Sequence, residues 1–267
     1  RIEVQRRPAR AGEVVDGLLA VAGPGDVVGQ GSQVALFLRV VVARQLKRRG
    51  IEAHQIGEGL AVGIVGVAEL ESLAVRREDF VPPAYQGAAF TDTRIPLNPD
   101  AQEAERLGQV MLEPRVDARM LHDLQVQPTD RVLEIGAGSG YMAALLAARA
   151  ERVVSLEIDP DLAEFARENL RGAGVENAQV RQADGALDPI PDGPFDVIVL
   201  SGSVAEVPQK LLALLRDGGR LGAYVGHQPM MRATFVRRNG ERFETSQPWD
   251  VVVPRLRYFP EPSPFKF

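Results

Sequence analysis

The sequence predicts an α/β protein built on a doubly wound, mostly parallel Rossmann-like sheet with an antiparallel hairpin at its C-terminal edge. From residue 130 onward, short apolar runs alternate with helical stretches, and this spacing is typical of βαβ units with right-handed crossovers. The first run enters a turn with glycines at every second position, 136–140 (GAGSG). Acidic residues follow the next two runs, and open α/β sheets bind ligands at these strand ends.

The individual elements follow from apolar periodicity and turn signals. We expect five parallel strands, at 131–135, 152–157, 178–182, 195–200 and 220–225. Helices are expected between them, at 141–150, 160–172 and 207–215. Two later runs, 231–237 and 251–253, supply the hairpin. Ahead of the sheet, 107–124 is expected to be a helix with Pro114 in its first turn. The proline-rich stretch 254–267 is expected to lie extended on the surface.

Composition excludes several classes of function. The 267 residues carry a net charge of −5, whereas a general nucleic-acid binder is usually basic. There is no cysteine, which excludes disulfides and thiolate chemistry, and the histidines do not stand at metal-ligand spacing, so no metal site is expected. No apolar run reaches the roughly 18 residues that a membrane span needs. We therefore expect a cytoplasmic protein without a membrane or nucleic-acid partner.

The strongest local motif is 132–141 (VLEIGAGSGY), in which an apolar strand enters the glycine turn. Glycines let a ligand approach the backbone without a Cβ in the way, and free N–H groups at the helix start face that ligand. The dinucleotide fingerprint is G-x-G-x-x-G, but its third glycine position is Tyr141 here. Glu134 would repel a pyrophosphate but not a cationic sulfonium ligand with an amino group. The motif therefore disfavours a dinucleotide.

Two acids extend this candidate site to neighbouring strands. Glu157 ends the second strand, where a carboxylate is placed to accept hydrogen bonds from both ribose hydroxyls of a nucleoside; a solvent-facing glutamate is the alternative. Asp159 precedes Pro160 and is expected to cap the next helix. Asp184, followed by Gly185, is placed to accept a hydrogen bond from an adenine amino group, or else forms a plain turn.

These residues resemble the class I S-adenosylmethionine-dependent methyltransferases and, more narrowly, the protein-L-isoaspartate O-methyltransferase family. The narrower resemblance is carried by the segments 75–82 (VRREDFVP), 95–97 (IPL), 108–109 (GQ), 130–141 (DRVLEIGAGSGY), 195–200 (FDVIVL) and 218–221 (GGRL), with Asp92. It covers 71–256 and is most specific from 108 to 226.

The resemblance implies S-adenosyl-L-methionine as cofactor and an isoaspartyl carboxylate of a damaged protein or peptide as methyl acceptor. A carboxylate is already ionised at neutral pH, so orientation of the two reactants suffices without a general base. By the same resemblance, eight residues hold the cofactor: Glu134, Gly136, Gly138, Ser139, Gly140, Glu157, Asp184 and Gly185.

The acceptor segment departs from the family pattern. The family usually carries G-Q-T-I-S-x-P, whereas this chain reads 108–114 (GQVMLEP), which puts Val110 at the threonine and Leu112 at the serine credited with a catalytic role. Leucine cannot donate a hydrogen bond to a carboxylate. The catalytic residue is therefore left unassigned, and slow isoaspartyl methylation is expected unless another donor, Ser139 or Ser201, takes over. The stretch 98–107 also resembles an insertion near the substrate loop.

The chain is expected to divide into four parts and to act as a monomer. Residues 1–70 are an N-terminal extension of uncertain order without a family counterpart. They form a small accessory domain, a loosely ordered extension, or a mistranslated upstream region. Residues 71–127 hold lead-in helices and the acceptor-site segment, 128–256 form the S-adenosylmethionine-binding methyltransferase domain, and 257–267 form an extended tail.

Three functions stay open on the sequence. The leading hypothesis is an O-methyltransferase of the isoaspartyl type, or a divergent relative with a different acceptor. The second is a cofactor-binding homologue with little transfer activity, which Leu112 suggests. The third is a nicotinamide-dependent oxidoreductase, which Tyr141 and Glu134 disfavour.

Overall fold

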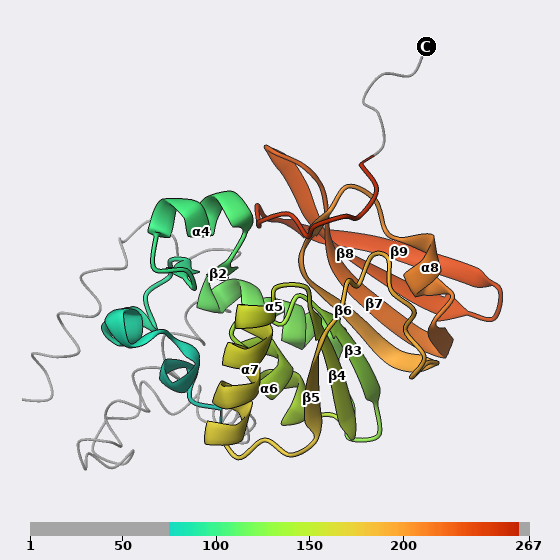
Figure 1. The fold of residues 1–267 in the computed structure, drawn as a ribbon. Helices are drawn as coiled ribbons and strands as arrows, with labels where there is room; N and C mark the ends of the chain where they lie inside the picture. Colours follow the sequence, from blue (N-terminus) through green and yellow to red (C-terminus); the bar gives the residue numbers. More distant parts are fainter. Residues whose placement is uncertain (1–74, 262–267) are drawn as a thin grey trace, which may run out of the picture. The chain divides into compact units, whose positions relative to one another are not determined.

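The computed structural model describes residues 75–261, so the predictions for 1–70 and for the end of the tail lie outside the described residues. Its centre is a seven-stranded sheet in the order β5-β4-β3-β6-β7-β8-β9 (Figure 1). The strands from β5 to β7 pair in parallel, and β8 is antiparallel to both of its neighbours. The predicted fold class is therefore confirmed, including the antiparallel hairpin at the C-terminal edge.

The bounds of the elements are as follows. The strands are β1 (Ile95–Pro96), β2 (Val110–Met111), β3 (Arg131–Ile135), β4 (Arg152–Glu157), β5 (Ala178–Gln182), β6 (Phe195–Val204), β7 (Leu215–His227), β8 (Met230–Asn239) and β9 (Arg242–Asp250). The helices are η3 (Arg77–Phe80), η4 (Pro83–Ala88), α4 (Ala101–Leu107), α5 (Pro114–Leu124), α6 (Tyr141–Ala147), α7 (Pro160–Gly172) and α8 (Gln209–Leu212).

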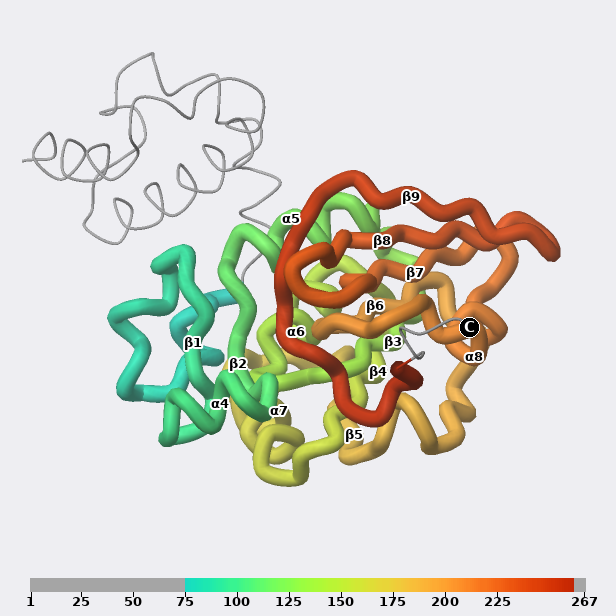
Figure 2. The backbone as a smooth tube through the Cα atoms, turned by 90° about the horizontal axis from the view of Figure 1, so that it is seen from above, coloured from blue at the N-terminus to red at the C-terminus, as the bar shows by residue number. Residues whose placement is uncertain are grey.

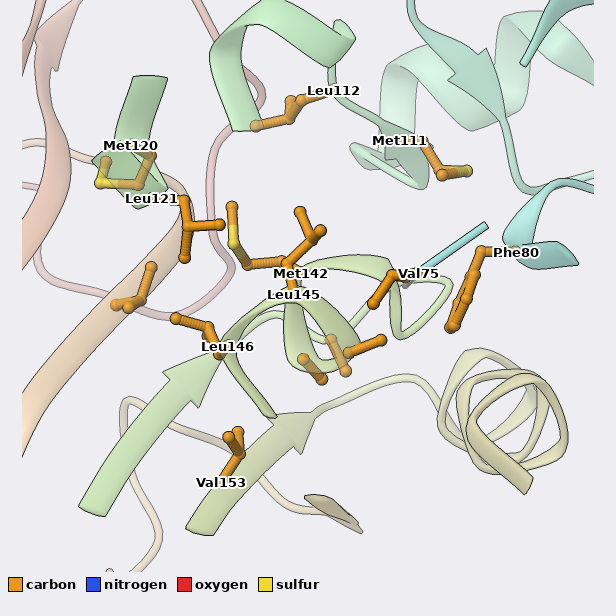
Figure 3. Packing of buried hydrophobic residues seen from close by; sticks show 14 of the residues in the cluster. Val75, Phe80, Met111, Leu112, Met120, Leu121, Met142, Leu145, Leu146 and Val153 are labelled. Atoms are coloured by element: carbon orange, nitrogen blue, oxygen red, sulfur yellow. The ribbon is translucent and has the colours of Figure 1, made fainter. Parts of the chain in front are cut away.

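Successive side chains of a strand point to opposite sides of the sheet, and in this sheet the side chains on both sides are buried. Val132 and Val153 pack into the cluster formed with α5, α6 and α7, part of which is shown in Figure 3. Leu133 and Val154 belong to a second cluster on the other face, with α8 and Phe259. This two-sided burial explains the continuous apolar runs of β3 and β4 in the sequence.

The segment before the sheet differs from the single helix expected over 107–124. Helix α4 ends at Leu107, and Gly108 takes a left-handed φ of 71° that ends the helix. The short strand β2 follows, and a new helix starts at Pro114, which occupies the first turn as expected. The acceptor segment thus lies between two helices, and β2 pairs with β1.

Two other expectations near the C-terminal edge are wrong. The predicted helix over 207–215 shrinks to α8 because Leu215 already begins β7. The second strand of the hairpin is Arg242–Asp250 rather than 251–253. This edge strand is exposed at nearly every position, so it lacks the apolar alternation that marks a half-buried strand.

The chain after β9 is built into the fold as far as Phe259, instead of lying on the surface from residue 254. Val253 and Phe259 are buried. The backbone N–H of Ser203 in β6 donates to Pro254 O at 2.7 Å, and Leu256 N–H donates to Ser203 O at 2.9 Å. Figure 2 shows this segment passing beside the strand ends. Among the described residues, no helix is both long and apolar enough to cross a membrane.

Candidate active site

A cavity opens at the carboxyl ends of the central strands, where the sequence places the site. The glycine loop after β3, the end of β4 and the turn after β5 form one side. The acceptor segment from Leu107 to Leu112 and the segment 254–259 form the other side. A topological switch lies here, because β3 pairs with β4 on one edge and with β6 on the other.

The three glycines of the loop share a backbone conformation but have different surroundings. Gly136, Gly138 and Gly140 have φ angles of 92°, 53° and 82°, a region that L side chains rarely adopt. The first two line the cavity. Gly140 does not: a Cβ there would come within 3.1 Å of the backbone oxygen of Ala166 in α7. Gly140 therefore allows α6 and α7 to pack closely.

Glu157 lines the cavity at the end of β4 and is buried, so the solvent-facing alternative is wrong. Its Oε2 accepts a hydrogen bond from Gly138 N–H at 2.8 Å, and its Oε1 accepts one from Asp159 N–H at 3.0 Å. Burial raises the pKa of this carboxyl, and the backbone hydrogen bonds oppose that rise. Each carboxylate oxygen has a second lone pair, so both can still accept from a ligand.

Asp184 and Gly185 line the same cavity from the turn after β5. Asp184 Oδ1 accepts hydrogen bonds from the backbone N–H groups of Ala186 and Leu187, at 2.7 and 3.1 Å. One carboxylate oxygen thus shapes the turn. A Cβ at Gly185 would come within 2.5 Å of Ile135 Cγ2, so only glycine lets this turn approach β3.

Glu134 and Ser139 are placed away from the cavity wall. Glu134 has no exposed surface and accepts hydrogen bonds from the hydroxyls of Ser155 and Ser201, at 2.6 and 2.7 Å. Burial raises its pKa to about 8, because the two serine hydrogen bonds only partly offset the loss of hydration. Ser139 is buried, and its carbonyl accepts from Asn169 Nδ2 at 2.9 Å. Five of the eight predicted cofactor residues therefore line the cavity: Gly136, Gly138, Glu157, Asp184 and Gly185.

Leu112 lines the cavity and also belongs to the apolar cluster between α5 and α6 (Figure 3). Its backbone oxygen accepts a hydrogen bond from Arg77 Nη2 at 2.5 Å. Arg77 is completely buried, pairs with Asp117 at 2.7 Å and donates to Ala89 O at 2.9 Å. Its guanidinium lies 4.7 Å from the ring centre of Tyr141. This one side chain thus fixes the acceptor segment to α5 and to the start of α6.

Sequence reasoning missed several residues of the cavity. Asp159 caps α7 as expected, but its Oδ2 also accepts a hydrogen bond from Gln109 Nε2 at 2.8 Å, which joins the acceptor segment to the start of α7. The segment from Pro254 to Leu256 was missed because its position depends on pairing with Ser203, some fifty residues earlier in the chain. Leu256 lies over the loop: a Cβ at Gly136 would come within 2.9 Å of its Cδ2.

Comparison with known proteins gives a consistent picture. The model of the protein-L-isoaspartate(D-aspartate) O-methyltransferase (PCMT) family matches residues 66–254. The protein-L-isoaspartate O-methyltransferase of Methanoregula boonei is 37% identical over 197 residues, which is 74% of this chain and 86% of that protein. The corresponding protein of Methanoculleus marisnigri is 41% identical over 172 residues, covering 64% of this chain and 74% of its own.

Solved structures share the fold. One is a Plasmodium falciparum chain described as a candidate protein-L-isoaspartate O-methyltransferase in complex with S-adenosyl-L-homocysteine. It aligns with a TM-score of 0.60 at 20% identity and covers 82% of this chain and 98% of that chain. A second protein-L-isoaspartate O-methyltransferase aligns with a TM-score of 0.61 at 22% identity, over 83% of this chain and 65% of that one. At these identities the likeness supports the fold.

Proposed function

The chain belongs to the protein-L-isoaspartate(D-aspartate) O-methyltransferase family, and we propose that it transfers a methyl group from S-adenosyl-L-methionine to a carboxylate of isoaspartyl residues in damaged proteins. The observation that carries the proposal is the convergence of Gly138, Glu157 and Asp184 on one cavity, opposite the acceptor segment. The reaction is inferred from the family, and the residues that would support it are inferred from the geometry of the cavity.

The cavity residues fit a nucleoside that carries a positive charge. Glu157 offers two buried carboxylate oxygens, each with acceptor capacity left for one hydroxyl of a ribose diol. Asp184 Oδ1 is taken up by backbone N–H groups, which leaves Oδ2 for an amino group such as that of adenine. Gly136 and Gly138 present bare backbone to the cavity. We assign these four residues, with Gly185, to cofactor binding.

In this proposal, three residues that do not line the cavity stabilise the glycine loop: Glu134, Ser139 and Gly140. Glu134 connects Ser155 of β4 with Ser201 of β6, and Ser201 itself lines the cavity. Gly140 sets the distance between α6 and α7. The role of these three residues is to hold the loop in the shape that leaves Gly136 and Gly138 open to the ligand.

Methyl transfer to a carboxylate requires little acid–base chemistry from the protein. When bound, S-adenosyl-L-methionine supplies an electrophilic methyl group on sulfur. The acceptor carboxylate is ionised at neutral pH and needs no general base. The chain's residues therefore act by position: Glu157 and Asp184 fix the nucleoside, and the acceptor segment and residues 254–259 exclude water from the opposite wall.

Binding and transfer measurements test this function against the alternatives. Calorimetry with S-adenosyl-L-homocysteine and separately with NAD⁺ should show affinity only for S-adenosyl-L-homocysteine. This result would exclude a nicotinamide-dependent oxidoreductase function. Labelled methyl transfer to an aged protein, with the freshly prepared protein as control, should then give incorporation that grows with age. Tight binding without incorporation would favour a cofactor-binding homologue or another acceptor.

We further propose a protein substrate without nucleic-acid or membrane partners, and a monomer acting in the cytoplasm. The net charge of −5 supports the absence of a nucleic-acid partner. Light scattering after size-exclusion chromatography tests the monomer, which should elute as one species near the chain mass of 29.0 kDa.

A further inference from the structure

The acceptor carboxylate needs a hydrogen-bond donor, and the acceptor segment does not provide one from Val110 or Leu112. Ser139 does not line the cavity. Ser201 lines it, but its hydroxyl donates to the buried Glu134 at 2.7 Å. Gln109 Nε2 donates to Asp159 at 2.8 Å. These three side chains are therefore either absent from the wall or already bonded within the protein.

Arg255 lines the same cavity and has an unused donor. Its Nη2 donates to Gly226 O at 2.9 Å and lies 3.3 Å from His227 Nδ1, and its Nε pairs with Glu261 at 2.9 Å. Its Nη1 is buried and has no hydrogen-bond partner among the described residues. A buried N–H group without a partner is costly, so this nitrogen is a site where a ligand oxygen would lower the free energy.

The backbone of Arg255 is held against the acceptor segment. It bridges to Ser203 of β6, and Ser203 is completely buried. A Cβ at Gly108 would lie 3.1 Å from Pro254 Cβ and 3.4 Å from Arg255 O, so the two segments are in contact. Arg257 adds a hydrogen bond of 3.4 Å to Leu107 O. The backbone of Arg255 is thus anchored next to the segment that carries Leu112.

We propose that Arg255 binds the carboxylate that accepts the methyl group and takes over the role of the hydroxyl missing at Leu112. The proposal rests on the methyltransferase function proposed above and identifies how the substrate is recognised. One carboxylate oxygen accepts from Nη1, and the other attacks. The new oxygen–carbon bond forms as the carbon–sulfur bond of the sulfonium breaks, with the electron pair leaving on sulfur and no proton transferred. A charge-assisted hydrogen bond from arginine suits this role.

Arg255→Gln tests the proposal, because glutamine removes the charge and shortens the side chain. The KM for an isoaspartyl peptide should rise at least about tenfold, while the KM for S-adenosyl-L-methionine changes less than about twofold. The KM of Arg255→Lys for the isoaspartyl peptide should lie between that of the wild-type protein and that of Arg255→Gln. Arg232→Gln, which removes an exposed pair with Asp250 near the start of β8, is the matched control and should leave both constants unchanged. Glu261→Gln removes a competing carboxylate and should lower the peptide KM.

A second pair of measurements separates recognition from folding. In the presence of S-adenosyl-L-homocysteine, calorimetry should show that Arg255→Gln weakens binding of the isoaspartyl peptide but not of the same peptide with that carboxyl as an amide. Leu112→Ser in the Arg255→Gln background should recover part of the lost rate, since a hydroxyl then supplies a donor.

The outcomes distinguish this proposal from the proposed function. If the wild-type protein methylates the isoaspartyl peptide and Arg255→Gln matches it in peptide KM and affinity, the assignment of Arg255 is wrong and the function stands. If the wild-type protein neither binds nor methylates the peptide, the proposed function is wrong, and the role proposed for Arg255 is wrong as well.

Discussion

The carboxylate of Glu157 accepts a hydrogen bond of 2.8 Å from the backbone N–H of Gly138. The end of β4 thereby fixes the conformation of the loop that follows β3, and both residues line the cavity. A second hydrogen bond, from Asp159 N–H, holds the other oxygen of the same carboxylate. The residue assigned to the ribose is thus also the residue that shapes the glycine loop.

Glu157→Gln should weaken binding of S-adenosyl-L-homocysteine by about 1–3 kcal/mol, or roughly tenfold to a hundredfold. An amide nitrogen would replace one carboxylate oxygen, and it would face an N–H donor instead of accepting from it. Calorimetry measures the affinity. Glu151→Gln, an exposed change just before β4, is the control and should leave the affinity unchanged. Equal affinities for the wild-type protein and Glu157→Gln would remove Glu157 from the cofactor site.

Gly138→Ala should lower the affinity for the same ligand at least about tenfold, because the added methyl group enters the cavity. Gly174→Ala is a matched control: both glycines have positive φ, at 53° and 68°, but a Cβ at Gly174 would meet nothing within 4 Å. Both variants should lose about 1 kcal/mol of stability from backbone strain. Only Gly138→Ala should lose affinity, and a loss of equal size in both would show that strain alone is responsible.

Arg77→Lys should lower the free energy of unfolding by about 1–3 kcal/mol, because lysine cannot reach Ala89 O, Asp117 and Leu112 O together. Urea denaturation measures the change. Arg115→Lys is the control, since Arg115 pairs with Asp92 where both side chains are about half exposed, and such pairs contribute about 0–1 kcal/mol. A variant at position 77 as stable as this control would contradict the anchoring role of Arg77.

The stability of the protein should depend on the protonation of Glu134. Its pKa in the folded protein is about 8, against an ordinary value of 4.5, because of burial. Between these two values the folded state binds the extra proton, so the contribution of Glu134 to stability is present at low pH and is lost as pH rises toward 8.

Glu134→Gln, which is neutral at all pH values, isolates this effect. The free energy of unfolding of the wild-type protein minus that of the variant should fall steadily between pH 5 and pH 8. Urea titrations across that interval measure the difference. A constant difference would mean that Glu134 stays ionised in the folded protein.

Much of the fold was predictable because its strands are buried on both faces. The predicted bounds of β3, β4 and β5 agree with the structure, and Asp159 with Pro160 marks the start of α7. Strand β9 was not predictable from apolar alternation because it is an exposed edge strand that contains Pro248. The break at Gly108 was masked because apolar residues continue at helical spacing through 107–124.

Some residues of the site were likewise predictable from the sequence, and others were not. Residues directly after strand ends, such as Gly136, Glu157 and Asp184, were predictable because topology alone brings them together. The orientation of Glu134 was not, because it depends on the hydroxyl of Ser155 opposite it on β4 and on Ser201. Arg255 gave no local signal, since only its pairing with Ser203 brings it to the cavity.

The most direct test of the function is methyl transfer to two peptides of one sequence, one with an isoaspartyl and one with a normal aspartyl residue. The proposed function predicts incorporation of labelled methyl groups into the isoaspartyl peptide, with kcat/KM at least about a hundredfold above that of the aspartyl peptide. The product should release its label in base, as a methyl ester does. No transfer to the isoaspartyl peptide by a protein that binds S-adenosyl-L-homocysteine, or equal transfer to both peptides, would contradict the proposed isoaspartyl methyltransferase function.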